Sequence, residues 1–212
     1  MAVYDLEEQE QLDELKSWWQ QYRKLILLMV IAATAAGGGI QGWRYYQSRQ
    51  ALEAGELYSQ LQGAVGGGDQ KKVQDIATVM VEKYPRTSYA VFAAFAGAKA
   101  AFDSDDMTAA KVRFQWVVDN AREDEMREIA RLRLAAILLD EKQYDAALKL
   151  LETGHSESLS ALYADLKGDV LVAQGKNNEA RAAYQLALDK SDAKSAYRAL
   201  IQIKLDALGE AK

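Results

Sequence analysis

The chain has 212 residues, of which 26 are basic and 31 are acidic, and its formal net charge is −5. This balance gives no electrostatic reason to expect nucleic acid binding. Because the chain contains no cysteine, disulfides, cysteine-ligated zinc and cysteine nucleophiles are excluded. Alanine, leucine, lysine, glutamate and glutamine are abundant and β-branched runs bounded by turn residues are scarce, so the sequence predicts an all-α protein.

Residues 1–22 are predicted to form an amphipathic tail. Apolar side chains recur there near helical spacing, with acidic residues between them. The apolar positions are Leu6, Leu12, Leu15, Trp18, Trp19 and Tyr22. A short helix that leads into a membrane fits this pattern, and a frayed polar tail that ends in interface anchors fits it equally well.

Residues 23–46 are predicted to cross a membrane as one helix. The run between Lys24 and Arg44 carries no formal charge. As a helix it extends roughly 28 Å, close to the ~30 Å thickness of the hydrocarbon core of a bilayer. Aromatic rings, which favour the two membrane interfaces, flank the run on both sides. They are Trp18, Trp19 and Tyr22 before it, and Trp43, Tyr45 and Tyr46 at its far end.

A cleaved signal peptide and a buried helix of a soluble protein are the alternatives for this apolar run. The letters "ATA" at residues 33–35 resemble a signal-peptide cleavage site. However, the segment before the run carries six acidic and three basic side chains, whereas a signal peptide begins with a short basic segment. A retained anchor is therefore the favoured interpretation.

Basic residues near the span indicate its orientation. Lys16, Arg23 and Lys24 precede the span, and Arg44 and Arg49 follow it. An excess of basic residues marks the cytoplasmic side, so the three-to-two ratio predicts a cytoplasmic N-terminus. The domain that follows the span is then expected across the membrane, which in a bacterium is the periplasm.

Small side chains four residues apart occupy the second half of the span. This spacing lets a second helix approach closely and gain van der Waals contact that lipid cannot match. The predicted packing residues are Ala32, Ala35, Ala36, Gly38, Gly39 and Gly42. The alternative is that glycine and alanine are simply common in membrane helices.

Residues 47–212 are predicted to form a tetratricopeptide-like α-solenoid of helical hairpins. The segment from Ala130 aligns with the segment from Ala164, and an earlier copy from Ala93 aligns with the segment from Ala130 at a slightly longer offset. The offset between the last two copies matches the helix–turn–helix period of roughly 34 residues that is typical of tetratricopeptide repeats. The last copy has consensus-like residues at Gly168, Leu171, Gly175, Ala180, Tyr184 and Ala187.

In this register the earlier copies depart from the consensus. The first copy has the charged Arg113 where phenylalanine is expected, which leaves open that its register is shifted by one residue. The second copy has Leu134 and Glu141 where glycine is expected. A further helical pair upstream has Lys72 near the expected alanine. These departures predict divergent repeats.

Turn residues set the limits of the repeat array. The upstream pair is expected to turn at residues 66–69 and to close at Pro85. After the last copy, a lone helix from Ser195 is predicted to cap the open end of the stack.

Residues that could carry catalysis are nearly absent. His155, the only histidine, lies in a predicted turn with no orienting partner in sequence. The segment "GGGDQKK" at residues 66–72 lacks the spacing of a phosphate-binding loop. The acidic cluster Asp103, Asp105 and Asp106 lacks the downstream glutamate of a calcium loop and is predicted to cap the next helix. The sequence therefore predicts no enzyme, no cofactor and no metal.

The first helix of each hairpin is predicted to line a concave binding groove, as in other solenoids. The candidate groove residues are Ala94, Ala98, Phe102, Arg131, Leu138, Asp165, Asp169 and Val172. This mixture of small, apolar and charged residues suits an extended peptide or a partner helix better than a small charged ligand. The alternative is that the apolar members are ordinary core residues.

The whole chain resembles the ancillary Sec translocon subunit family of Gram-negative bacteria. The resemblance rests on the acidic opening "VYDLEEQEQLDELKSWW", the Gly/Ala-rich span that ends in "GWRYYQSRQ", and the degenerate repeats "LRLAAILLDEKQYDAALKLL" and "ALYADLKGDVLVAQGKNNEARAAY". The segment "GWRYYQSRQ" is its most distinctive part.

The resemblance implies an inner-membrane protein with residues 1–22 in the cytoplasm, an anchor at residues 23–46 and a periplasmic repeat domain at residues 47–212. It implies association with the Sec translocon and with a membrane-anchored periplasmic chaperone of the peptidyl-prolyl isomerase type. The expected function is a non-enzymatic adaptor that helps pass exported polypeptides to periplasmic chaperones. An autonomous membrane-tethered chaperone that binds unfolded clients directly is the alternative.

Overall fold

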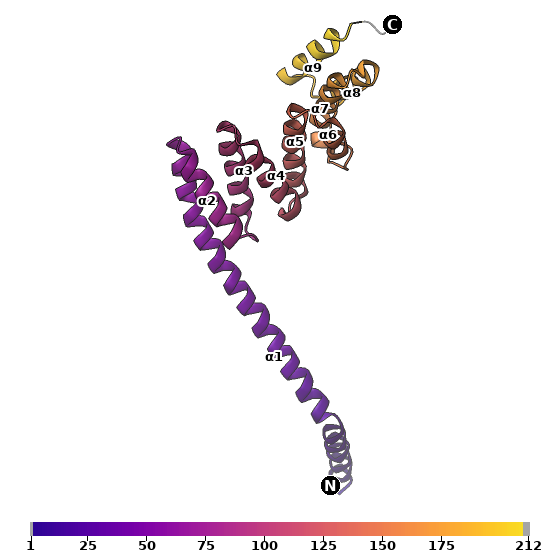
Figure 1. Ribbon diagram of the computed structural model, residues 1–212. Helices are drawn as coiled ribbons and strands as arrows, with labels where there is room; N and C mark the ends of the chain where they lie inside the picture. Colours follow the sequence, from indigo (N-terminus) through magenta and orange to yellow (C-terminus); the bar gives the residue numbers. More distant parts are fainter. Residues whose placement is uncertain (1, 210–212) are drawn as a thin grey trace. The chain divides into compact units, whose positions relative to one another are not determined.

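The computed structural model describes the backbone of residues 2–209, and the side chains of residue 12 and of residues 15–209. Throughout this part the chain is α-helical and contains no strand, which confirms the predicted fold class. Figure 1 shows the elements in chain order. They are α1 (Ala2–Gly66), α2 (Gln70–Lys83), α3 (Ser88–Asp103), α4 (Met107–Asn120), α5 (Asp124–Asp140), α6 (Tyr144–Leu151), the 3-10 helix η1 (Glu157–Leu159), α7 (Ser160–Ala173), α8 (Asn177–Lys190) and α9 (Ala196–Ala207).

Helix α1 contains both the predicted tail and the predicted span. The side chain of Leu6, one of the tail's apolar positions, lies outside the described residues. Among the described residues, α1 is the one helix that is long and apolar enough to cross a membrane, and its most apolar stretch is not buried within the protein. The chain divides into two compact units, residues 1–50 and residues 51–212.

The second unit is a series of antiparallel helical hairpins. Residues 51–66 of α1 pair with α2, and the following pairs are α3 with α4, α5 with α6, and α7 with α8. Helix α9 packs on α8 and closes the series, as predicted for a capping helix.

Each hairpin turns at a residue with positive φ. These residues are Gly68 (φ 70°), Asp105 (φ 61°), Lys142 (φ 62°) and Gly175 (φ 76°). In each turn three backbone amides bond back to carbonyls of the preceding helix, which satisfies groups that the helix end would leave unpaired. The predicted turn at residues 66–69 is therefore confirmed.

The predicted capping role of the acidic cluster is confirmed for Asp106. The carboxylate of Asp106 accepts a hydrogen bond from the amide of Ala109 at 2.9 Å, at the first turn of α4. Asp69 caps α2 in the same way, through the amide of Lys72 at 3.0 Å. Equivalent turn chemistry thus starts the second helix of the first two hairpins.

The turns also reveal the true repeat register. The interval from Asp105 to Lys142 equals the predicted offset between the copies from Ala93 and Ala130, so that offset is confirmed. The interval from Lys142 to Gly175 is one residue shorter than the predicted offset between the last two copies, so that prediction is wrong by one residue. Because the register of both earlier copies is referred to the last copy, this single residue misplaces both of them by one position.

With the turns aligned, the earlier copies follow the tetratricopeptide pattern closely. Ala110, Ala147 and Ala180 are equivalent, and none of them has exposed surface. The aromatic position is filled by Phe114, Leu151 and Tyr184, each less than a tenth exposed. Arg113 therefore does not occupy this position, and the alternative that the first copy is shifted by one residue is confirmed. In the upstream hairpin the buried Val73, and not Lys72, takes the place of the alanine.

Arg113 instead reaches across to α2. Its guanidinium donates to the carbonyl of Gln74 at 3.1 Å and to the hydroxyl of Thr78 at 2.8 Å. Burial lowers the pKa of this guanidinium from its usual value. The side chain passes over Gly97, where an added Cβ would lie 2.9 Å from Arg113 Nε and 2.8 Å from Ala77 Cβ. Gly97 therefore allows α3 to approach α2 while Arg113 joins α4 to α2.

Candidate partner-binding groove

Two of the predicted groove residues, Ala94 and Ala98, have no exposed surface. Both belong to the core cluster that joins α3, α4 and α5. Ala98 is the equivalent of Gly168 in the corrected register, and small residues at this position let the two helices of a hairpin cross closely. The prediction of a groove role for these two alanines is therefore wrong.

Three other predicted residues lie at the margins of the first-helix face. Arg131 is half-buried and donates to the carbonyl of Gly154 at 3.3 Å, which ties α5 to the turn after α6. Leu138 is half-buried against the core, and Val172 on α7 is exposed. None of the three lines the two hollows described below.

Asp165 and Asp169 are bound by the capping helix. Lys204 of α9 donates to both oxygens of Asp165 at 3.0 and 2.9 Å and to Asp169 Oδ2 at 2.7 Å. The Asp165 residue is 4% exposed, so its charge is almost fully enclosed. The two aspartates therefore hold α9 on α7. Asp165 also lines the second hollow described below, as predicted for a groove residue, whereas Asp169 lines neither hollow.

Two tyrosines complete this network, which we call the α9 latch (Asp165, Asp169, Tyr184, Tyr197 and Lys204). The Tyr197 hydroxyl donates to Asp165 at 2.6 Å, and the Tyr184 hydroxyl donates to Asp169 at 2.8 Å. Burial, together with the hydrogen bonds to these carboxylates, raises the pKa of both tyrosines. Burial opposes the charge of Lys204, but the hydrogen bonds to the two aspartates outweigh it and raise its pKa.

The latch predicts a loss of stability at alkaline pH. Below about pH 10 the folded and unfolded chains hold the same protons on Tyr184, Tyr197 and Lys204, so the latch contributes fully. Above about pH 10 the unfolded chain releases these protons while the folded protein retains them, and the free energy of unfolding falls. Urea unfolding followed by circular dichroism between about pH 8 and 11 measures this slope. Tyr197→Phe is expected to make it shallower, and an equal slope in both proteins would contradict the assignment.

Phe102 lies in a distinct hollow between α3, α4 and α5, which we call the phenylalanine hollow. Its volume is about 510 Å³, within the ~300–1,000 Å³ range of typical ligand sites. Phe102 itself is 44% exposed. The lining residues are Phe95, Lys99, Phe102, Asp103, Phe114, Arg133, Ala136, Ile137 and Asp140. Of the predicted groove residues, Phe102 alone is among them.

A second hollow of about 380 Å³ adjoins the first. It shares Arg133 and Ala136 of α5 with the phenylalanine hollow, so the two are continuous along this helix. Its lining is mainly aliphatic: Ile129, Leu132, Arg133, Ala136, Leu159, Leu162, Asp165, Leu166 and Tyr197. Together the two hollows form what we call the groove.

Aromatic residues continue beyond the phenylalanine hollow toward the first hairpin. The ring centroids of Tyr58 and Tyr89 lie 5.3 Å apart, and those of Tyr58 and Phe92 lie 6.1 Å apart. Phe92 is 41% exposed. The chain has four phenylalanines, and all of them belong to α3 or to the adjoining face of α4. The rings of Phe92 and Phe102 are exposed on this surface, which makes it a candidate for partner binding.

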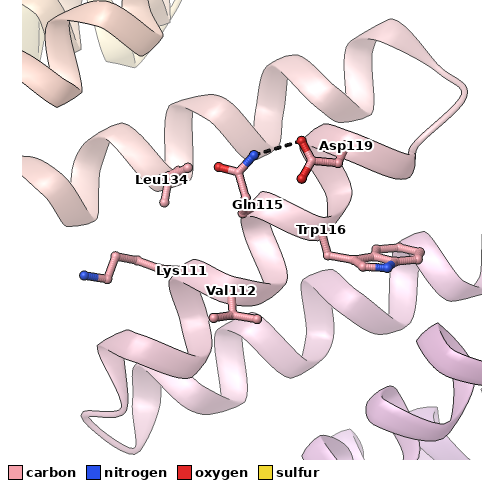
Figure 2. A pocket seen from close by; sticks show the side chains of 6 residues that line it. All are labelled: Lys111, Val112, Gln115, Trp116, Asp119 and Leu134. Atoms are coloured by element: carbon pink, nitrogen blue, oxygen red, sulfur yellow. Dashed lines mark hydrogen bonds between the residues drawn. The ribbon is translucent and has the colours of Figure 1, made fainter.

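A separate hollow of about 420 Å³ lies on α4. Figure 2 shows Lys111, Val112, Gln115, Trp116 and Asp119 of α4, with Leu134 of α5 beside them. Gln115 donates to Asp119 at 2.9 Å, as the dashed line in the figure marks. Lys111 is bound by Glu141 at 2.7 Å. The polar groups here largely satisfy one another.

His155 lies in the predicted turn and is exposed. Its ring packs beside Tyr163, with 4.2 Å between the centroids, and its Nδ1 lies 3.1 Å from the carbonyl oxygen of Ser156. The nearby Glu128 is buried, and it accepts hydrogen bonds from the amide and hydroxyl of Ser156. Although burial opposes the charge of Glu128, these bonds lower its pKa. Within the described residues, no cluster of three or more potential metal ligands is found.

These features define a tetratricopeptide-like helical repeat protein whose N-terminal helix has the length and composition of a membrane span. A family profile described as "Tetratricopeptide repeat-like domain" matches residues 16–210. The match covers most of the chain and confirms the predicted repeat fold.

Comparison with curated proteins identifies the family. The chain is 33% identical to "Ancillary SecYEG translocon subunit" of Neisseria gonorrhoeae over 96% of the chain and 98% of that protein. It is 33% identical to the protein of the same name from Haemophilus influenzae, over 87% and 90% of the two chains, and 30% identical to that from Escherichia coli, over 79% and 81%. The chain therefore belongs to the ancillary SecYEG translocon subunit family, which confirms the resemblance in the sequence. No solved structure matches the chain significantly.

Proposed function

We propose that this protein is a membrane-anchored, non-enzymatic adaptor that associates with the SecYEG translocon and receives polypeptide partners in its repeat domain. Full-length similarity to proteins named as translocon subunits supports the association. The proposal that the repeat domain receives polypeptide partners rests on the groove, because the groove is a large apolar surface on the face that solenoids use for partners.

The proposed topology follows the basic residues that flank the span. Residues 1–22 lie in the cytoplasm, residues 23–46 cross the inner membrane and residues 47–212 lie in the periplasm. The ratio of three basic residues before the span to two after it supports this orientation. The groove is then available to exported polypeptides and to a membrane-anchored chaperone of the peptidyl-prolyl isomerase type.

The small residues of the span are proposed to contact a membrane helix of a partner. Ala32, Ala35, Ala36, Gly38, Gly39 and Gly42 are all exposed. A Cβ added at Gly38 or Gly42 meets no other atom within 4 Å, so the surface is open to a close neighbour. Close approach of two helices is the benefit that small residues provide in lipid.

Replacing Gly38 and Gly42 with leucine is expected to preserve membrane insertion and to reduce co-purification with SecYEG by at least about five-fold, because the added bulk blocks close helix approach. Quantitative mass spectrometry of mild-detergent pull-downs measures the ratio. Leu27→Ala with Leu28→Ala, in the first half of the span, is the control and is expected to retain the partner. Unchanged recovery after the glycine replacements would refute a role for this face.

A pull-down of the full chain, compared with one whose residues 23–46 are replaced by an unrelated anchor, tests the proposed function. Recovery of SecYEG and a periplasmic chaperone with the natural chain, and their loss with the swapped anchor, would identify the span as a specific docking element. Persistence of the same partners after the swap would assign recognition to the repeat domain. Absence of both from the natural chain would overturn the proposal.

The accessible phenylalanine rings favour a second candidate, an autonomous membrane-tethered chaperone that binds unfolded clients directly. An adaptor is recovered with the same few proteins in a nearly fixed ratio. A chaperone suppresses the aggregation of unrelated unfolded proteins at substoichiometric to equimolar amounts. Light scattering of two unrelated aggregating clients, with and without the full chain in detergent, therefore separates the two functions.

A further inference from the structure

The phenylalanine hollow has an apolar floor that is built from rings. Phe95 and Phe114 meet edge to face, with 6.0 Å between their centroids, and Ile137 of α5 closes the floor with little exposure. Phe102 forms one wall and is 44% exposed. In water, uncovered rings of this kind lose the free energy that burial would provide, so the hollow favours an apolar occupant.

Two charged residues of the lining, Arg133 and Asp140, have no ion-pair partner among the described residues. The other two lining charges satisfy each other, because Lys99 binds Asp103 at 2.6 Å. Arg133 and Asp140 both lie on α5, and their sequence separation corresponds to about 10 Å along the helix. The hollow therefore has a positive end and a negative end, separated by about two helical turns.

We propose that the phenylalanine hollow binds an amphipathic α-helix of a partner protein, with an acidic and a basic side chain two turns apart beside its apolar stripe. Residues at positions i, i+3, i+4 and i+7 of such a helix enter the rings, while the acidic side chain meets Arg133 and the basic one meets Asp140. This inference rests on the proposed adaptor function and specifies the partner segment that the groove takes.

A helix fits this surface better than an extended strand does. An extended segment needs hydrogen bonds for its own backbone amides and carbonyls, and the described part of the repeat domain has no strand edge to supply them. The floor of the hollow consists of rings and aliphatic groups, which form no such bonds. A helix satisfies its own backbone and presents only side chains to the groove.

Synthetic peptides binding to the full chain in detergent micelles test the inference. The first probe is a fluorescent helix of about five turns with leucines at i, i+3, i+4 and i+7, and with glutamate and lysine two turns apart beside the stripe. The second has the same composition in an order without an apolar face. The third has lysine at both charged positions. Fluorescence anisotropy measures the Kd of each probe.

The first probe is expected to bind at least about ten-fold more tightly than the second. Phe102→Glu is expected to abolish this preference, because a carboxylate enters the apolar hollow. Val112→Glu is the matched control, since Val112 is also exposed but lies on the hollow of α4 shown in Figure 2. It is expected to change nothing, and circular dichroism of both variants checks that they fold.

Reversal of one charge gives a test that does not depend on overall affinity. Arg133→Glu makes both unpaired charges of the hollow acidic, because Asp140 is the other, so it is expected to weaken the first probe and strengthen the third, each by about five-fold. Equal binding of the first two probes, an unchanged order of the first and third, or a Kd above about 1 mM for all three would overturn the inference.

The same protein samples are tested for co-purification with SecYEG. Recovery of SecYEG without any preference among the peptides overturns the inference and leaves the adaptor function standing. Loss of SecYEG from the natural chain overturns the adaptor function, and the peptide series then reports on the hollow alone.

Discussion

Gly168→Ala is expected to lower the free energy of unfolding of the repeat domain by about 2–4 kcal/mol, a large effect for a single added methyl group. A Cβ at this position would lie 2.4 Å from Cε1 and 2.5 Å from Cδ1 of Tyr184. The ring cannot move aside without loss, because Tyr184 is 3% exposed and its hydroxyl donates to Asp169 at 2.8 Å. The methyl group therefore strains the crossing of α7 and α8.

Three energetic contributions together decide whether Gly168→Ala lowers or raises the free energy of unfolding. Overpacking costs about 1–3 kcal/mol, and the loss of a hydrogen bond to a carboxylate costs about 1.5–3 kcal/mol. The better helix propensity of alanine returns only about 1 kcal/mol. Urea unfolding of the full chain in mild detergent, followed by far-ultraviolet circular dichroism, measures the difference.

Gly63→Ala is the matched control for this prediction. Gly63 lies in α1, and a Cβ added there meets no other atom within 4 Å. Without a steric cost, the helix-propensity term remains, so this variant is expected to be more stable by about 0.5–1 kcal/mol. Opposite shifts for the two substitutions would support the close crossing, and a stabilised Gly168→Ala protein would show that Tyr184 has room to move.

The helices and turns could be predicted because their determinants are local. The glycine turn at residues 66–69, the capping aspartate Asp106 and the helical spacing of apolar residues all act within a few positions along the chain. The register of the earlier copies could not be predicted in this way. Asp105 and Lys142 turn the chain with positive φ although neither is glycine, so the usual turn residue is missing from both.

The missed register explains most of the errors at the candidate site. The sequence register puts Arg113 at the consensus aromatic position and Phe114 one position away, so it does not predict the pairing of Phe114 with Phe95 across two helices. Phe95 and Leu132 occupy equivalent positions on α3 and α5 at the confirmed offset between the first two copies, and both line the groove. Residues at this position, rather than Ala94 and Ala98, indicate which face of the repeat domain is the candidate binding face.

Sequence periodicity does not predict the α9 latch, for a different reason. Lys204 binds aspartates that are 39 and 35 residues earlier in the chain, and no repeat relation connects them. Asp165 and Asp169 follow helical spacing on α7, which is equally typical of a solvated face or a groove. Only the packing of α9 on the last hairpin distinguishes these possibilities.

Lys204→Met is expected to destabilise the repeat domain by about 2–3 kcal/mol, because it leaves two carboxylates facing each other without a cation. Fully buried pairs cost more, about 3–5 kcal/mol when one partner is removed. Here the Lys204 side chain is 25% exposed and that of Asp169 is 29% exposed, so solvent screens part of the loss. The hydroxyls of Tyr184 and Tyr197 still stabilise the aspartates, which further limits the loss of stability.

The loss of stability is expected to be greatest in α9, since Lys204 is the charged contact between this helix and α7. Hydrogen exchange of the α9 amides, compared with those of α3, measures local opening, and we expect acceleration in α9 alone. Lys190→Met is the control: Lys190 binds Glu157 at 2.7 Å, but the two side chains are 39% and 76% exposed. The loss of this surface pair should therefore cost less than about 1 kcal/mol. Equal effects of the two methionine variants would show that the latch is worth no more than a surface ion pair.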